Sequence, residues 1–328
     1  MNQSFRTLCT VGLIAAAVGC GSSDVKGEQT DRVASATTLQ SGSTLFAGRN
    51  IYSPTVIFDD QEQIYKMWYG GWQTQSDYPN DHIFYRSSVD SVRWSDPVTV
   101  VSPKSVLPTG VHANDPNVTK TYNTLSKTYQ YTMFYTFCTG GCTDAESSIW
   151  SAVSADGLNW YYHQAVMTGG TTNPSVIYEP GAGGAIWKLY FINRVEGALN
   201  VKMVPIGGAR TPVGSPSVVH SPANTTVGDV EVRKVGGVWQ LFYNKMGLNL
   251  TDIYVAQSTD NTIFAAAAAP FLVMQGSTAF CAALTPGILP TGGSNYKMFF
   301  SLTQLPLNAG QCDLSNRTLA MQLWNLSL

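Results

Sequence analysis

The 328-residue sequence has little charge and little that would form helices. Charged residues make up only 12% of the chain and the formal net charge is −2, so neither a nucleic acid nor an anionic surface is expected as a partner. The most helix-friendly run, 265–269, is stopped by Pro270 and is too short to form a stable helix. Phosphate-binding glycine loops, Gly-x-Ser-x-Gly elbows and metal-type histidine spacings are missing, which argues against the corresponding enzyme classes.

The apolar stretch near the N-terminus, Leu8–Gly19, is shorter than the ~20 residues that span a bilayer. It follows Arg6 and ends before Cys20, and it resembles a bacterial lipoprotein signal, whose cysteine is lipidated after cleavage. An ordinary secretory signal cut nearby is the alternative. We expect an exported protein, either secreted or held at an outer membrane or cell surface through its lipid alone. The expected segments are a signal peptide (1–19), a flexible tether (20–42) and a folded domain (43–328).

Four cysteines remain after those of the targeting segment are set aside: Cys138, Cys142, Cys281 and Cys312. Four cysteines in an exported protein suggest two disulfides, for which the sequence permits three pairings. We favour the first with the second, across the turn CTGGC, and the third with the fourth. A zinc site is the competing interpretation, but the spacing is not Cys-x-x-Cys and no histidine lies near either pair.

Five similar aromatic words recur along the chain: YKMWY at 65, YTMFY at 131, WKLYF at 187, WQLFY at 239 and YKMFF at 296. Each follows, by 10 to 16 residues, a second phrase: SPTVI at 53, DPNVT at 115, NPSVI at 173, DVEVR at 229 and TPGIL at 285. A third phrase with a Ser-x-Asp turn follows in three units: SVDSVRW at 88, SADGLNW at 154 and STDNTIF at 258. Turn-forming residues separate the phrases, so each unit predicts several short antiparallel strands.

Repeats of this kind predict an all-β, five-bladed β-propeller with four antiparallel strands per blade. The aromatic words fit its second strands, which neighbouring blades cover on both faces. A β-sandwich or two stacked β-domains would explain the strands but not the ordered phrases. We expect 317–328 to give the third strand of the last blade and 43–50 its outer strand, which would join the two ends of the chain.

In a propeller, the first residue of each innermost strand faces the central funnel. The five openings are Ser53, Asp115, Asn173, Asp229 and Thr285. Glu231 lies two residues beyond the fourth opening and shares its strand face.

At these residues the chain, from about position 45 onward, resembles the five-bladed propellers of glycoside hydrolase family 43 and the related invertase- and levansucrase-like enzymes. The resemblance rests on the repeat number, the Asp-Pro openings, the aromatic second strands and the Ser-x-Asp-Gly-x-x-Trp turn. The word NDPN, 114–117, is similar to the nucleophile phrase of invertase-like members. The resemblance implies an oligo- or polysaccharide partner, cleaved by one carboxylate as base or nucleophile and another as acid, with a further Asp tuning the acid.

The chain departs from that pattern at several openings. The family expects a carboxylate at the first opening and an Asp at the third, where this chain has Ser53 and Asn173. Asp115 lies on the second blade, where the family usually has no catalytic acid. Asp229, or less well Glu231, lies where the acid is expected. If the ring is rotated to make Asp115 the base, a threonine takes the position of the acid.

Three interpretations stay open. Asp115 could be the base of a rearranged glycosidase, with Asp229 or Glu231 as its acid. The funnel could instead bind a sugar without cleaving it, with Trp72 and Tyr52 stacking on pyranose faces. In the third interpretation the acids are structural, because an Asp before Pro often caps a turn.

Weaker candidates complete the predicted site. The openings Ser53, Asn173 and Thr285 are expected to bind sugar, and His112 could be a sugar or cation ligand. Arg86, Arg194 and Arg233 could each balance a funnel carboxylate or bind an anionic sugar, and the alternative is that they are surface residues without such a role. No cofactor is expected, although a structural cation in the funnel stays open, and the protein is expected to be a monomer.

Overall fold

The structure is a computed structural model, which divides into two units, 1–32 and 33–328. It describes residues 37–38, 44–46, 49–74, 80–123, 127–180, 184–222, 225–245, 251–265, 270–273, 280–304, 312 and 317–324, all in the second unit. The predicted signal peptide, Cys20 and most of the predicted tether lie outside these residues. None of the described helices is long and apolar enough to span a membrane.

The described strands form five sheets. The first contains β3 (Arg49–Asp59), β4 (Ile64–Trp72), β5 (His82–Ser88) and β6 (Val98–Val101), and the second contains β7 (Gly110–Asn123), β8 (Thr128–Thr139), β9 (Ser148–Ser154) and β10 (Tyr161–Met167). The third contains β11 (Thr171–Tyr178), β12 (Ala185–Asn193), β13 (Val201–Gly207) and β14 (Ser217–His220). The fourth contains β15 (Val227–Val235), β16 (Val238–Lys245), β17 (Asp252–Ser258), β18 (Leu272–Val273) and β1 (Thr37–Thr38), and the fifth contains β19 (Phe280–Gly292), β20 (Asn295–Gln304), β21 (Arg317–Trp324) and β2 (Thr44–Phe46). Two short helical turns, α1 (Pro103–Val106) and η2 (Asp144–Glu146), lie between strands.

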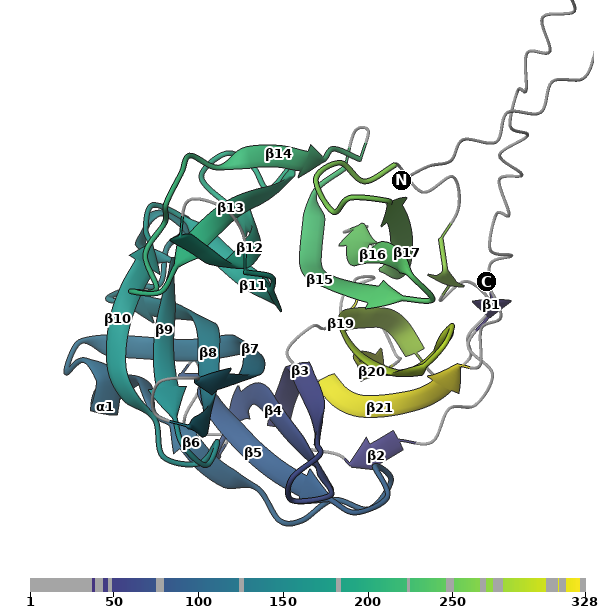
Figure 1. Ribbon diagram of the computed structural model, residues 1–328, viewed down its shortest axis with the longest axis horizontal. Helices are drawn as coiled ribbons and strands as arrows, with labels where there is room; N and C mark the ends of the chain where they lie inside the picture. The colour runs from purple at the N-terminus through teal and green to yellow at the C-terminus, as the bar shows by residue number, and fades with distance from the viewer. Residues whose placement is uncertain are drawn as a thin grey trace, which may run out of the picture. The chain divides into compact units, whose positions relative to one another are not determined.

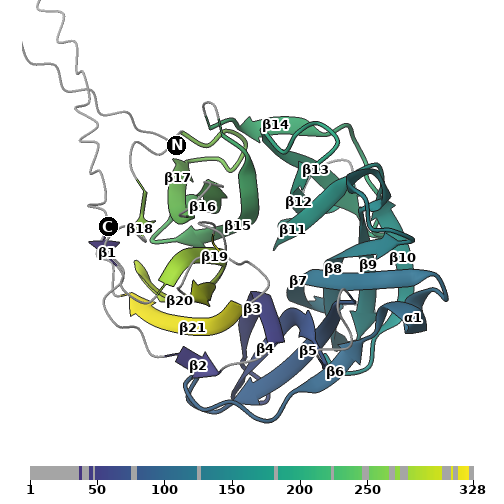
Figure 2. The same ribbon diagram turned by 180° about the vertical axis from the view of Figure 1, so that it is seen from behind.

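The sheets are arranged around a central axis, with the first long strand of each sheet innermost (Figures 1 and 2). Each of β3, β7, β11 and β15 contacts the next innermost strand, and β19 contacts β3, so the ring closes. The predicted all-β propeller is therefore confirmed. Four sheets have the predicted four antiparallel strands, whereas the fourth sheet also carries β1, which pairs in parallel with β18 and was not predicted.

An N-terminal strand and the last described strand pair with each other in the fifth sheet. Strand β21 is its third strand and β2 pairs antiparallel with β21 as the outer strand. Both assignments agree with the sequence prediction, and an N-terminal strand in the last sheet fastens the ring.

The apolar core consists of five clusters, one in each seam between neighbouring sheets. In the first aromatic word, Met67 packs toward the fifth sheet and Trp68 toward the second. Both are completely buried, as expected for a strand with a neighbouring sheet on each face. This burial on both faces explains why the second strand of every sheet has apolar residues on both sides of its pleat.

The lysine in the first aromatic word contacts the Ser-x-Asp turn of the next sheet. Lys66 Nζ donates to the Asp156 carbonyl at 3.3 Å, and Trp68 Nε1 donates to the Gly157 carbonyl at 2.8 Å. Gly157 has φ +80°, and a Cβ there would lie 2.7 Å from the Trp68 ring, so only glycine fits.

The same contact recurs in two other seams. Lys188 donates to the side chain and Tyr190 to the carbonyl of Asn261, in the turn of the fourth sheet. Lys297 donates to Ser91, in the turn of the first sheet. The aromatic segments that contain a lysine belong to the first, third and fifth sheets. The Ser-x-Asp turns belong to the next sheet around the ring in each case, which is the second, the fourth and the first. The lysine of one sheet and the Ser-x-Asp turn of the next therefore form a recurring contact between neighbouring sheets.

Both predicted disulfides are formed. One joins Cys138 to Cys142 and the other joins Cys281 to Cys312. The second bond links the innermost strand of the fifth sheet to the segment before β21 and closes a loop of 31 residues.

Candidate functional site: the axial cavity

One cavity lies where the innermost strands meet, and its lining comes from all five sheets. The lining residues are Ser53 and Pro54, Asp115 to Asn117, Asn173 and Pro174, Asp229 to Glu231, and Thr285 and Pro286. All five predicted opening positions are thus brought together, although each lies inside its innermost strand and not at the strand's first residue, where it was predicted. Their sugar-binding or catalytic roles remain predictions.

Four of the openings share an unusual backbone conformation. Ser53, Asp115, Asn173 and Thr285 have φ of 49°, 48°, 55° and 53°, each directly before a proline. The register of each of these strands shifts at this point, as at a β-bulge. Such conformations cost about 1–3 kcal/mol per residue and collect at functional sites. The X-Pro dipeptides thus mark the bends at the cavity in four of the five innermost strands, whereas Asp229 in the fourth sheet is followed by a valine.

The two carboxylates at openings each accept a hydrogen bond from the preceding sheet. Ser53 Oγ donates to Asp115 Oδ1 at 2.7 Å, and Asn173 Nδ2 donates to Asp229 Oδ1. The donors Ser53 and Asn173 are both neutral, so these two contacts orient the carboxylates without neutralising them. Ser53 and Asn173, at the openings where the resemblance led us to expect acids, are therefore the hydrogen-bond partners of Asp115 and Asp229.

Glu231 lines the same cavity but is only 2% exposed. Its Oε2 accepts from Asn117 Nδ2 and Ser175 Oγ, both at 2.9 Å, and its Oε1 pairs with Arg233 at 2.7 Å. Burial raises the pKa of Glu231, and the Arg233 charge and these donors oppose that shift. The residue predicted as an alternative acid thus belongs to a buried ion pair that ties β7, β11 and β15 together. Arg233 balances a funnel carboxylate, as the sequence suggested.

The cavity itself is narrow, with a volume of about 20 Å³, enough for roughly one water. Small-molecule pockets typically measure about 300–1,000 Å³. Thr285 illustrates the tight packing, because it is 2% exposed and its hydroxyl hydrogen-bonds with Ser301 Oγ at 2.7 Å. A sugar ring would have to lie across the opening of this cavity and could not enter it.

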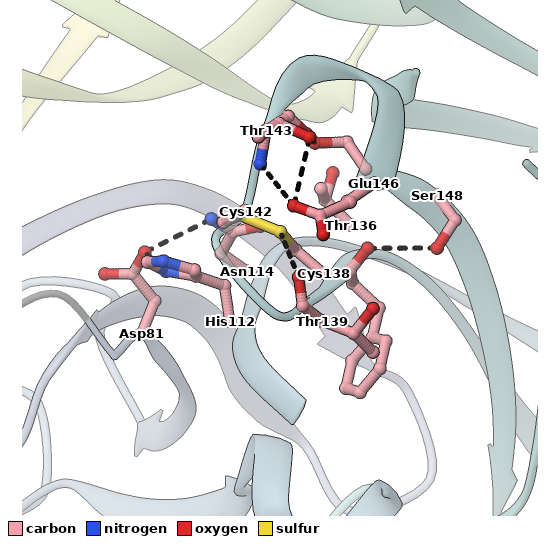
Figure 3. Close-up of a disulfide and its surroundings, with 12 residues drawn as sticks. Asp81, His112, Asn114, Thr136, Cys138, Thr139, Cys142, Thr143, Glu146 and Ser148 are labelled. Atoms are coloured by element: carbon pink, nitrogen blue, oxygen red, sulfur yellow. Dashed lines mark hydrogen bonds and ion pairs between the residues drawn. A yellow bond between two sulfur atoms is a disulfide. The ribbon is translucent and has the colours of Figure 1, made fainter. Parts of the chain in front are cut away.

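Three predicted binding residues do not line the cavity: Tyr52, Trp72 and His112. The Tyr52 ring is buried beside Gly70 and its hydroxyl accepts from Asn114, so it offers no stacking face. Trp72 is half-buried at the end of β4. His112 pairs with Asp81 next to the first disulfide (Figure 3).

Sequence reasoning missed Asp81 and Asn117. Asp81 directly precedes β5 and meets His112 only in the folded seam between the first two sheets, so no local pattern marks it. Asn117 lies in the quoted word NDPN, and its place two residues after Asp115 was the available signal. Among the described residues, no group of three or more His, Cys, Asp or Glu side chains could hold a metal ion.

Comparison with solved structures identifies the same propeller in glycoside hydrolases. An exo-1,5-α-L-arabinanase from a bovine ruminal metagenomic library matches at 13% identity and TM-score 0.60, over 84% of this chain and 94% of its own. An endo-1,4-β-xylanase from Bacteroides thetaiotaomicron matches at 16% and 0.65, over 88% and 94%. A xylan β-1,4-xylosidase from Bacillus halodurans matches at 14% and 0.67, over 87% and 55%. No protein-family profile and no curated protein sequence matches the chain. At these identities the likeness shows the fold.

Proposed function

We propose that this protein is a five-bladed propeller that binds an oligo- or polysaccharide across the mouth of its axial cavity. The observation that carries the proposal is the convergence of equivalent residues from all five innermost strands on one cavity, with Asp115 and Asp229 in its lining. The solved neighbours named as arabinanase, xylanase and xylosidase support a carbohydrate as the ligand class.

The lining suits sugar hydroxyls. Carboxylates accept strong, charge-assisted hydrogen bonds from hydroxyl groups, and Asn173 can donate and accept. The bends before the prolines and the contacts from Ser53 and Asn173 hold these groups in place before a ligand arrives. Such preorganisation lowers the entropic cost of binding.

Hydrolysis is a second candidate, favoured by the two carboxylates that share the cavity. In that case Asp115 acts as base or nucleophile and Asp229 as acid, because Glu231 is already paired with Arg233. A separation of about 5 Å between the carboxylates would give retention, and about 6.5–9.5 Å inversion.

The test is a screen of the purified chain against linear arabino- and xylo-oligosaccharides, measured by thermal shift and by analysis of cleavage products. We expect at least one to raise the Tm, and Asp115→Asn to remove the shift. The control is Asp60→Asn, which changes a carboxylate whose side chain is 71% exposed. Cleavage by wild type that Asp115→Asn and Asp229→Asn both abolish would establish the hydrolase. Absence of both binding and cleavage across the panel would refute a carbohydrate function.

The proposal extends to location. Two disulfides suit an oxidising compartment. We propose export followed by lipidation of Cys20, with the propeller acting as a monomer at a bacterial outer membrane or cell surface.

A further inference from the structure

A second polar cluster lies in the seam between the first and second sheets. Asp81 Oδ2 meets His112 Nδ1 at 2.6 Å and accepts from Asn114 Nδ2 at 3.3 Å (Figure 3). Asn114 Nδ2 also donates to Tyr52 Oη at 2.8 Å. The Asp81 carbonyl accepts from the Ala113 amide at 3.0 Å, which fixes the backbone of this carboxylate against β7.

The cluster adjoins two residues that line the axial cavity, although its own four residues are not part of that lining. Asn114 and Tyr52 directly precede Asp115 and Ser53, the two openings that are hydrogen-bonded to each other. Equivalent residues of the two strands therefore make two consecutive contacts across one seam. His112 shares its strand face with Asn114 and is two residues farther from the bend.

The pairing fixes which nitrogen of His112 carries the proton. An ionised carboxylate only accepts, so Nδ1 must donate to Asp81. Nε2 is then the acceptor of the neutral ring. His112 makes no other hydrogen bond with the described residues, and its side chain is 14% exposed, whereas that of Asp81 is 8% exposed. The geometry is that of a buried carboxylate which orients a partly buried imidazole.

The cluster is not optimised as a purely structural network. Asp81 Oδ1 and Asn114 Oδ1 are buried and have no hydrogen-bond partner among the described residues. Unsatisfied buried acceptors are rare and destabilising, and those that persist call for a reason beyond stability. Orientation of His112 toward a ligand supplies that reason.

We propose that His112 binds the glycan directly, its Nε2 accepting a hydrogen bond from a ring hydroxyl of a neutral sugar, and that Asp81 is the positioning residue that holds the required tautomer. The inference rests on the proposed function, because the ligand is the glycan that lies over Asp115. It adds a binding subsite on the side of the cavity that belongs to the first two sheets.

The test combines affinity with a spectrum of the imidazole. Titrations of wild type, His112→Gln and Asp81→Asn with xylotetraose and arabinotetraose would give Kd. The ¹⁵N signals of the four histidines would report protonation, with His112 assigned by its loss in His112→Gln. We expect Kd to rise about 3- to 10-fold in both variants. The Nε2 signal should be that of an acceptor in free wild type, and should shift when the sugar binds.

His163→Gln is the matched control, because His163 is also partly buried and hydrogen-bonded, to Tyr135 at 2.8 Å, but lies on β10, at the opposite end of the second sheet from the innermost strand β7. It should leave Kd unchanged. Thermal unfolding would verify that Asp81→Asn folds, and the more exposed His112→Gln provides the decisive Kd if it does not.

Two outcomes would overturn the inference, and they differ in whether the proposed function also fails. If wild type binds sugar and Asp115→Asn abolishes binding, but His112→Gln leaves Kd within twofold and Nε2 does not shift, the subsite fails and the proposed function stands. If wild type binds neither sugar nor any other glycan tested, both fail together.

Discussion

The carboxylate of Asp59 is the most informative single position for the stability of the ring. It is completely buried at the end of β3 and contacts Lys66 at 3.2 Å and Lys120 at 2.5 Å, while Tyr131 donates to it. The two lysines come from the first and second sheets, so one carboxylate joins two sheets across their seam. Asp59→Asn removes the charge, keeps the shape and leaves both ammonium groups without their buried counter-charge.

Removal of one partner from a buried ion pair typically destabilises by about 3–5 kcal/mol. We expect Asp59→Asn to lose that amount in urea unfolding followed by tryptophan fluorescence, with a fall in Tm of roughly 5 to 15 °C. The neighbouring Asp60→Asn is the control. Its carboxylate is 71% exposed and lies 3.5 Å from Lys120, so its loss should change stability by less than about 1 kcal/mol.

The same carboxylate predicts a dependence on pH. Burial opposes ionisation of Asp59, but hydrogen bonds from Lys120, Tyr131 and Lys66 outweigh it and hold the pKa below its ordinary value. A lowered folded-state pKa contributes stability that is present above the unfolded-state value of about 3.9 and is lost as the pH falls below it. Wild type should therefore lose this contribution below about pH 4, and Asp59→Asn should lack that part of the loss. A change of less than about 1 kcal/mol at neutral pH in Asp59→Asn would refute the reasoning.

Three further variants test other contacts. Lys188→Met should lower stability by about 1 kcal/mol, measured by urea unfolding, because it removes a partly exposed pair with Glu179 at 2.8 Å; an unchanged midpoint would show that the contact between lysine and turn is dispensable. Replacement of Cys281 and Cys312 by alanine should cost roughly 3 kcal/mol, and reductant should then have no further effect on that loop. Glu231→Gln should destabilise by about 3 kcal/mol, because Arg233 loses its buried partner, and calorimetry showing full stability would exclude the ion-pair role.

Much of the fold could be predicted because two local sequence patterns, each with a clear physical cause, recur along the chain. Apolar residues on both sides of a second strand require cover on two faces, and an X-Pro dipeptide bends a first strand at a fixed place. Repetition of these two signals predicted the ring and four of the five residues at its axis, whereas Asp229, which is followed by a valine, was predicted from its place in the repeat. The strand Thr37–Thr38 was placed in the tether because two residues carry no periodic pattern.

The parts that could not be predicted depend on partners distant in sequence. Asp59 meets Lys120 across 61 residues and Asp81 meets His112 across 31, and neither pair has a spacing that marks it. Glu231 lines the cavity, as predicted. Its ion pair was indicated in the sequence by Arg233, which lies two residues farther along the same strand face. For the role of Glu231, an opposite charge two residues away in the same strand was therefore a better guide than its position near an opening.

The most direct test of a carbohydrate site at the axis is a crystal structure of the protein soaked with the oligosaccharide that gives the largest thermal shift. We predict electron density for a sugar ring across the cavity mouth, with hydroxyl groups within hydrogen-bond distance of Asp115 and Asp229. Density for the sugar elsewhere on the ring, with nothing over these two carboxylates, would contradict the account.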